Sequence, residues 1–175
     1  MDVILQRFID SQAQDLADLH ARSDVVNVRP IAANERIVGF LVALHCAHMV
    51  QQGSLVLERT DWCEFAIQLP EDYLQHDHSD SSRILTFLAP AALHHPNVAF
   101  PFVCVGPVAA STPLRQLILR VYEILTYNRF HPHEYDCLNQ HACQWARANV
   151  SRFPLERRAL VRTAPEGSGA AESEA

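Results

Sequence analysis

The sequence contains no lysine, and all 14 of its basic residues are arginine. Codon bias in a GC-rich genome is the simplest explanation, and the alanine and arginine content favours it. Acidic residues outnumber the arginines, which gives a formal net charge of −6. Such a chain lacks the broad positive surface that binds a phosphate backbone, so we expect no nucleic acid among its partners.

Long hydrophobic runs are also missing, and no stretch approaches the roughly 20 apolar residues that a transmembrane helix needs. The first residues lack the basic region and the cleavage site of a secretory signal. The five cysteines are an odd number at irregular spacings, which does not indicate a disulfide framework. We therefore expect a protein of the reducing cytoplasm with no membrane partner.

The composition is that of a folded chain with a substantial core, since 49% of the residues are hydrophobic. Its length fits one domain, which we place at residues 1–163. Residues 164–175 are small, acidic and glycine-bearing, a composition that predicts a disordered tail.

Hydrophobic periodicity predicts an α+β fold that begins with a helix over residues 2–22. Apolar runs bounded by turn residues predict strands that together form a four-stranded antiparallel meander. These strands cover residues 25–28, 36–45, 65–69 and 84–88, with an edge strand or hairpin arm at 55–57.

Two or three helices are expected after the meander. Apolar residues at helical spacing predict a core helix over residues 112–125, capped by Ser111 or Thr112 with Pro113 in its first turn. A second helix is predicted over residues 133–149. The basic stretch that follows is typical of a solvated helix, or alternatively of a surface that meets an acidic partner.

The most informative stretch is the triplet His95-Pro96-Asn97, followed by Phe100-Pro101-Phe102 and then Cys104. An asparagine side chain can donate an N–H to a developing oxyanion. A cysteine thiolate is the best protein nucleophile for acyl transfer. A cysteine between apolar neighbours is, taken alone, more often a buried strand residue.

The order of these features resembles the active-site region of ubiquitin-conjugating enzymes, above all their compact bacterial members. In that family a His-Pro-Asn motif precedes the thioester-forming cysteine, and a helix follows. Phe65 to Tyr73 looks like the family's strand that ends in a proline-bearing turn, and Thr112 to Leu125 looks like the helix after the active site. The resemblance covers residues 1 to about 150 and implies a UBC-like fold.

The resemblance implies that Cys104 accepts a ubiquitin-like modifier from an activating enzyme and passes it to an amine of a target protein. It gives Asn97 an oxyanion or loop-stabilising role and His95 a mainly structural role in the loop. It implies no metal and no organic cofactor, and a place in a bacterial antiviral operon. A chain without lysine cannot modify its own side chains through isopeptide bonds.

Several points stay open at this stage. A neighbouring group should lower the pKa of an attacking lysine amine, and Glu134, Asp136 and Tyr127 are candidates for that role. The N-terminal helix, which docks on the activating enzyme in the resembled family through a basic face, carries an acidic face here. The same fold without catalysis could bind a modifier as a scaffold. Cys104 with His94 or His95 could instead form an unrelated thiol hydrolase.

Other histidines and cysteines are weaker signals. His45-Cys46-Ala47-His48 has zinc-ligand residue types but no obvious fourth ligand. The segment from His76 to Asp80 is most simply a solvated loop. Cys137 and Cys143 fall on different faces of the predicted helix, which argues against a paired site.

Overall fold

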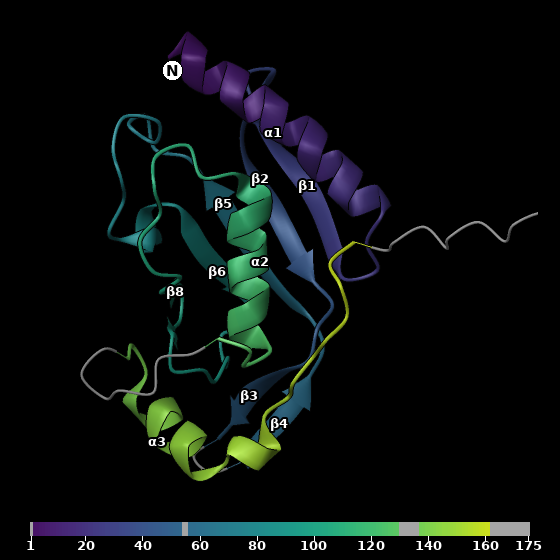
Figure 1. Ribbon diagram of the computed structural model, residues 1–175, viewed down its shortest axis with the longest axis vertical. Coiled ribbons are helices and arrows are strands. Elements are labelled where there is room, and N and C mark those ends of the chain that lie inside the picture. The colour runs from purple at the N-terminus through teal and green to yellow at the C-terminus, as the bar shows by residue number, and fades with distance from the viewer. Residues whose placement is uncertain (1, 54–55, 130–136, 162–175) are drawn as a thin grey trace, which may run out of the picture.

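The computed structural model describes residues 2–53, 56–129 and 137–161 (Figure 1). In chain order the elements are α1 (Val3–Ala21), β1 (Val26–Ala33), β2 (Arg36–Leu44), β3 (His48–Gln52), β4 (Val56–Thr60), β5 (Cys63–Gln68), the 3-10 turn η1 (Ser81–Arg83), β6 (Leu85–Ala89), β7 (Val98–Ala99), β8 (Phe102–Val103), α2 (Leu114–Leu125), α3 (Gln140–Ala148) and the 3-10 turn η2 (Val150–Arg152).

Four of the strands form an antiparallel sheet in the order β1-β2-β5-β6. Alternate residues of the two central strands are buried, among them Phe40, Val42, Phe65 and Ile67. α1 and α2 pack against this side of the sheet in one continuous core (Figure 1). The predicted α+β class is therefore confirmed, with its N-terminal helix, four-stranded antiparallel sheet and later helices.

A separate hairpin of β3 and β4 is inserted between β2 and β5. The apolar run predicted at residues 55–57 contributes to β4, so it is a hairpin arm and not an edge of the main sheet. Val50 of β3 forms an isolated bridge with Leu93, just before the His-Pro-Asn motif. The insertion thus ties the predicted site to the rest of the fold.

α1 and α2 are joined by polar contacts as well as by the core. The Leu114 N–H at the start of α2 donates to Oε1 of Gln12 at 2.8 Å, so the predicted cap by Ser111 or Thr112 is wrong. The hydroxyl of Thr112 donates instead to the Ala109 carbonyl. Serine and threonine are among the usual residues that cap a helix. Here the acceptor for the first N–H of α2 comes instead from Gln12 on the neighbouring α1.

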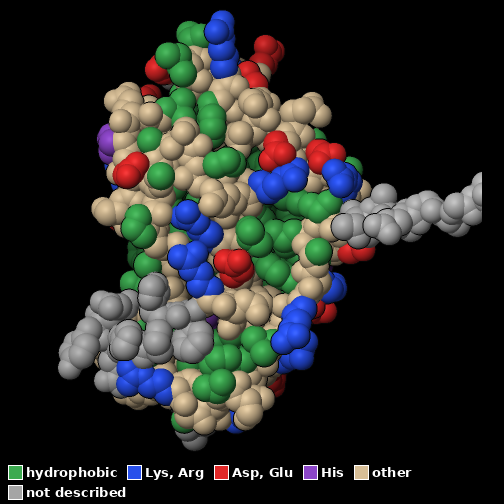
Figure 2. Space-filling model, viewed as in Figure 1, with side chains coloured by type: hydrophobic (Ala, Val, Ile, Leu, Met, Phe, Trp, Pro, Cys, Tyr) green, Lys and Arg blue, Asp and Glu red, His purple; other side chains and the backbone are tan. Residues whose placement is uncertain are grey.

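Part of the acidic surface of α1 is neutralised within the fold. Arg115 of α2 forms ion pairs with Asp15 at 2.8 Å and Asp18 at 3.4 Å. Acidic and basic side chains lie next to one another over this part of α1 (Figure 2). These aspartates therefore have a structural partner as well as a solvent-facing side.

The last helix is shorter than predicted. α3 begins at Gln140, and Asn139 caps it by accepting the Ala142 N–H at 3.0 Å. Residues 137–139 are not helical, while residues 133–136 of the predicted helix lie outside the described part of the chain.

The C-terminal segment, residues 153–161, is not the predicted solvated helix. Pro154 disfavours helical backbone in the residue before it, and the carboxylate of Glu156 accepts the N–H groups of Arg157 and Arg158. The segment runs back past β3 and β4 toward the end of α1 (Figure 1). The predicted tail at 164–175 lies outside the described residues.

Candidate functional site

The predicted site lies on residues 92–104, between β6 and α2, and neighbouring elements hold this loop through its main chain. The His94 N–H donates to the Met49 carbonyl of β3 at 2.8 Å. The Asn139 N–H, at the start of α3, donates to the Pro96 carbonyl at 3.1 Å. Two elements from different parts of the chain therefore fix the His-Pro-Asn motif.

His95 is fully buried inside the loop. Its Nδ1 accepts the Asn97 N–H at 3.0 Å, which requires this nitrogen to be unprotonated. The ring packs edge-on against Tyr127, with 4.3 Å between centroids. His95 therefore contacts the loop from inside, as the structural role implied by the resemblance requires.

Tyr127 supports the same loop. Its hydroxyl donates to the His94 carbonyl at 2.8 Å, and burial raises the pKa of this phenol. A buried phenol that is already donating does not fit the predicted role of assisting an acceptor amine. The other two candidates for that role, Glu134 and Asp136, lie outside the described residues.

Asn97 and Cys104 face each other at the open end of the hairpin formed by β7 and β8. The Cys104 N–H donates to the Asn97 carbonyl at 2.8 Å. The side-chain amide of Asn97 donates in turn to the Cys104 carbonyl at 3.1 Å. Of the two roles expected for Asn97, this contact matches loop stabilisation, because the amide points to the main chain of the cysteine.

The side chain of Cys104 is half-buried, in contrast to the fully buried Val103 and Val105 on either side of it. Phe100 and Phe102 of the same hairpin are 42% and 51% exposed. Of the apolar residues around the cysteine, the two valines therefore belong to the core, whereas the two phenylalanines are exposed. Cys104 itself is partly accessible to solvent.

The start of α2 contacts α1. Its first N–H is bonded to Gln12 on α1, as described above. Arg120, in the middle of the helix, donates to the carbonyl of Pro107, three residues after the cysteine, at 2.8 Å. Arg129 adds a second guanidinium, 3.7 Å from where a Cβ on Gly106 would lie.

A pocket of about 270 Å³ lies beside the loop and is lined in part by His94, Phe100 and Asn139. A larger pocket of about 530 Å³ lies between β4 and the C-terminal segment, where Arg59 and Arg158 face Asp61 and Glu156. Cys104 lines neither of them. These two pockets therefore do not enclose the thiol.

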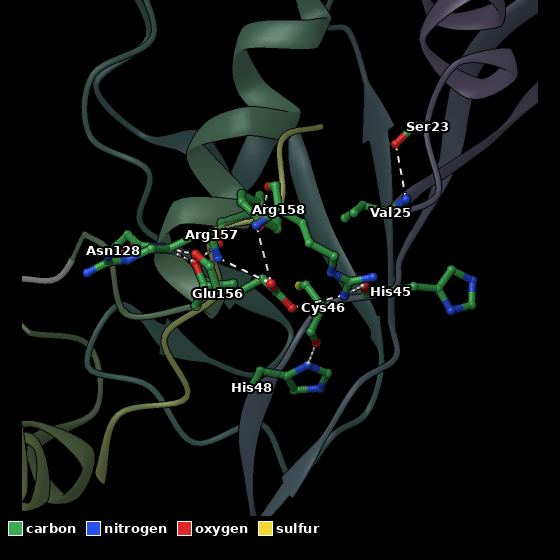
Figure 3. A network of polar contacts seen from close by, with 11 residues as sticks. Ser23, Val25, His45, Cys46, His48, Asn128, Glu156, Arg157 and Arg158 are labelled. Carbon is green, nitrogen blue, oxygen red and sulfur yellow. Dashed lines mark hydrogen bonds and ion pairs between the residues drawn. The ribbon is translucent and has the colours of Figure 1, made fainter. Parts of the chain in front are cut away.

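The residues considered for zinc at 45–48 differ in their exposure to solvent. His45 is exposed, whereas Cys46 and His48 are buried. His48 Nδ1 donates to the Cys46 carbonyl at 2.9 Å, and burial raises the pKa of the Cys46 thiol to about 12. Arg158 of the C-terminal segment donates to the His45 carbonyl at 2.7 Å (Figure 3). This network fastens the segment to the strand ends and brings no third ligand to Cys46 and His48 among the described residues.

Cys137 and Cys143 do not lie on different faces of one helix as predicted, because α3 begins at Gln140. The two thiols are hydrogen-bonded, and burial together with this contact raises the pKa of Cys137. Because α3 begins at Gln140, Cys137 precedes the helix and can reach a residue on its first turns. The prediction placed both cysteines on one helix that begins at residue 133.

Compared with models of protein families and with curated protein sequences, the chain matches none. No helix in the described ranges is long and apolar enough to cross a bilayer. Within the same ranges, no hydrogen bond or ion pair joins the Cys104 thiol to an imidazole. The hydrolase alternative with His94 or His95 therefore has no geometric support here.

Proposed function

We propose that this protein is a UBC-like conjugating enzyme for a ubiquitin-like modifier, with Cys104 as the acyl carrier. One observation carries the proposal. The asparagine of a His-Pro-Asn motif and a half-exposed cysteine are joined by two hydrogen bonds across a hairpin. The order of elements supports it, since an N-terminal helix, an antiparallel sheet, this loop and a core helix follow one another as the resembled family implies.

The proposed reaction has two acyl transfers. The modifier arrives as a thioester on a cysteine of the activating enzyme. The Cys104 thiolate attacks the C-terminal carbonyl of the modifier, so that a new C–S bond forms and the cysteine of the activating enzyme leaves as thiolate. An amine of the target protein then attacks the same carbonyl. A C–N bond forms, the amine loses a proton, and Cys104 leaves as thiolate. ATP is consumed by the activating enzyme alone, and this chain needs no cofactor.

In this mechanism Asn97 and His95 act by shaping the loop. His95 holds the Asn97 N–H, and Asn97 holds both main-chain groups of Cys104. A thiol whose main chain is fixed presents the thioester in one orientation, which favours attack by an oriented acceptor. The proposed setting is a bacterial cytoplasm, in which an antiviral operon supplies the modifier and the activating enzyme.

A non-catalytic scaffold is the second candidate, and one observation favours it. One N–H of the Asn97 amide donates to the Cys104 carbonyl, a contact that supports loop stabilisation and not an oxyanion role. In this alternative the exposed Phe100 and Phe102 bind the modifier without a covalent step. The two functions differ in whether Cys104 ever carries an acyl group.

The deciding experiment is thioester trapping. The protein is mixed with ATP and with the activating enzyme and modifier encoded beside it, and the products are run on a non-reducing gel. We expect an adduct that reductant removes from the wild type, persists as an ester on Cys104→Ser and is absent from Cys104→Ala. Cys137→Ser is the matched control, since Cys137 is the other half-exposed cysteine of the described chain, and it should load like the wild type.

Absence of an adduct, with an activating enzyme that loads its own cysteine, would favour the scaffold. Turnover of a simple thioester by the isolated protein would favour a hydrolase. Self-conjugates provide a further check, because a chain without lysine can carry them only at its amino terminus or on Cys, Ser or Thr side chains.

A further inference from the structure

A second group of ligand-type side chains lies apart from the cysteine loop. Asp72, His76 and His78 come from the connection between β5 and η1, and one ligand atom from each lies within 4.8 Å of the others. The sequence alone indicated only a solvated loop here. The structure instead converges two imidazoles and a carboxylate.

His78 is the fixed member of the group. Its N–H donates to the Val108 carbonyl at 2.7 Å, and its own carbonyl accepts the Val108 N–H at 2.9 Å. The ring is only 4% exposed and is stacked on Tyr73 with an interplanar angle of 13°.

The imidazole of His78 is held without hydrogen bonds. Its Nε2 is buried and has no partner among the described residues. Within that part of the chain, no hydrogen bond is seen at the other ring nitrogen of His78. Buried polar atoms are normally satisfied. The Nε2 atoms of His48 and His94 are likewise buried without a partner there, and His78 differs from them because a second imidazole and a carboxylate lie within 4.8 Å of its ligand atom. A bound cation would give the His78 ring a partner.

The spacing of the other two members matches a tetrahedral ion. Bonds of about 2.0–2.2 Å place two ligands of tetrahedral zinc roughly 3.3–3.6 Å apart. His76 Nε2 and Asp72 Oδ2 lie 3.3 Å apart as an ion pair, and a cation between them would replace this direct contact. The remaining distances, all within 4.8 Å, close by side-chain rotation, since the side chains of His76 and Asp72 are 54% and 30% exposed.

We propose that Asp72, His76 and His78 bind a divalent cation of the zinc class, with a fourth position open to solvent. Two imidazoles and one carboxylate suit zinc, whereas magnesium and calcium prefer oxygen ligands throughout. Arg83 donates to both oxygens of Asp72 at 3.3 and 3.4 Å and must yield the carboxylate in part. This exposed ion pair is a weak competitor.

The proposed ion would order the chain that leads from the cysteine loop to α2. His78 is bridged to Val108, and the Asp77 carboxylate accepts the Ala110 N–H at 2.9 Å. A cation that fixes residues 72–78 therefore also holds the segment opposite them. The inference concerns metal binding and stands whether or not Cys104 is an acyl carrier.

The test is a titration of the full chain, stripped with chelator, with zinc chloride in a calorimeter and with cobalt(II) in a visible spectrometer. We expect one bound ion with tetrahedral cobalt bands. His76→Ala and Asp72→Asn should each weaken zinc binding at least about tenfold, because even the loss of a group that only supports a ligand typically costs 10–100-fold. His20→Ala, an exposed histidine on α1, should bind like the wild type.

His76 carries the test because it is exposed, so its replacement should leave the circular dichroism spectrum unchanged. The proposal is overturned if the wild type binds no zinc or if His76→Ala binds as tightly as the wild type. It is also overturned if the bound ion is lost in Cys104→Ser but kept in Asp72→Asn, because the ion then lies on the thiol.

Discussion

Replacement of Asn97 by alanine tests what this side chain does for the cysteine loop. Asn97 is 3% exposed, and its amide donates to the Cys104 carbonyl at 3.1 Å. Loss of a partner for a buried polar group costs about 1–3 kcal/mol. The contact is only partly buried, so water can replace some of it, and we expect a loss of about 1–2 kcal/mol in the free energy of unfolding. For a chain of this size that corresponds to a melting temperature lower by about 2–8 °C.

The assay is thermal and urea unfolding of Asn97→Ala beside Asn27→Ala, an exposed asparagine on β1 whose loss should stay within about 0.5 kcal/mol. In the trapping system, discharge of the thioester below the unfolding transition should then stay close to the wild-type rate, because a chain that loses about 1–2 kcal/mol of an ordinary stability of about 5–15 kcal/mol remains almost entirely folded. An oxyanion donor behaves differently, since its removal slows chemistry about 10²–10³-fold without a matching change in unfolding. If Asn97→Ala is as stable as the wild type, the loop-stabilising reasoning is refuted.

Three further predictions concern stability. Gln12→Ala removes the acceptor for the Leu114 N–H and should destabilise the chain by about 0.5–2 kcal/mol, as loss of a helix cap does. Gly39→Ala places a Cβ 2.6 Å from a main-chain oxygen of the neighbouring strand and should cost about 1–3 kcal/mol. Burial lowers the pKa of His48 and His94 below the ordinary 6.5, so the unfolded chain binds more protons as the pH falls through about 6.5. Urea stability should therefore be lower at pH 5.5 than at pH 7.5, by at most about 1.4 kcal/mol per pH unit for each histidine.

Each of these predictions has its own control. Gln14→Ala, on an exposed part of α1, should leave the unfolding midpoint unchanged. An unchanged midpoint in Gly39→Ala would mean that β2 and β5 separate at no cost, contrary to the packing argument. His48→Gln should reduce the pH dependence and His20→Ala should not. Equal slopes in all three chains would contradict the assignment to buried histidines, because carboxyl groups titrate below this pH window.

The fold was largely predictable because its signals are local. Alternation in β2 and β5 and helical spacing in α1 and α2 each require only neighbouring residues, and these elements were placed within a few residues of their observed bounds. The C-terminal segment was mispredicted for a different reason. Arginine-rich sequence is compatible with a helix, but Pro154 and the carboxylate of Glu156 direct the backbone elsewhere.

The candidate site was predictable in its residues and not in its contacts. The motif named His95, Asn97 and Cys104, but the spacing could not show that the Asn97 amide points to a carbonyl and not to a thiol. Support from Tyr127 and from the N-terminus of α3 depends on contacts between residues more than thirty positions apart. Such contacts are set by how elements pack, which periodicity does not report.

The cysteine loop combines a rigid main chain with an accessible side chain, and this combination bears on what the site can do. β3, α3 and Tyr127 hold the motif, and the two bonds between Asn97 and Cys104 close the hairpin. Cys104 is half-buried, and Phe100 and Phe102 of the same hairpin are exposed. A small-molecule enzyme would enclose its nucleophile in a pocket, whereas an acyl carrier that passes a protein between two other proteins must present its thioester at the surface. In the acyl carrier that we propose, the fixed backbone would supply the orientation that an enclosing pocket otherwise gives.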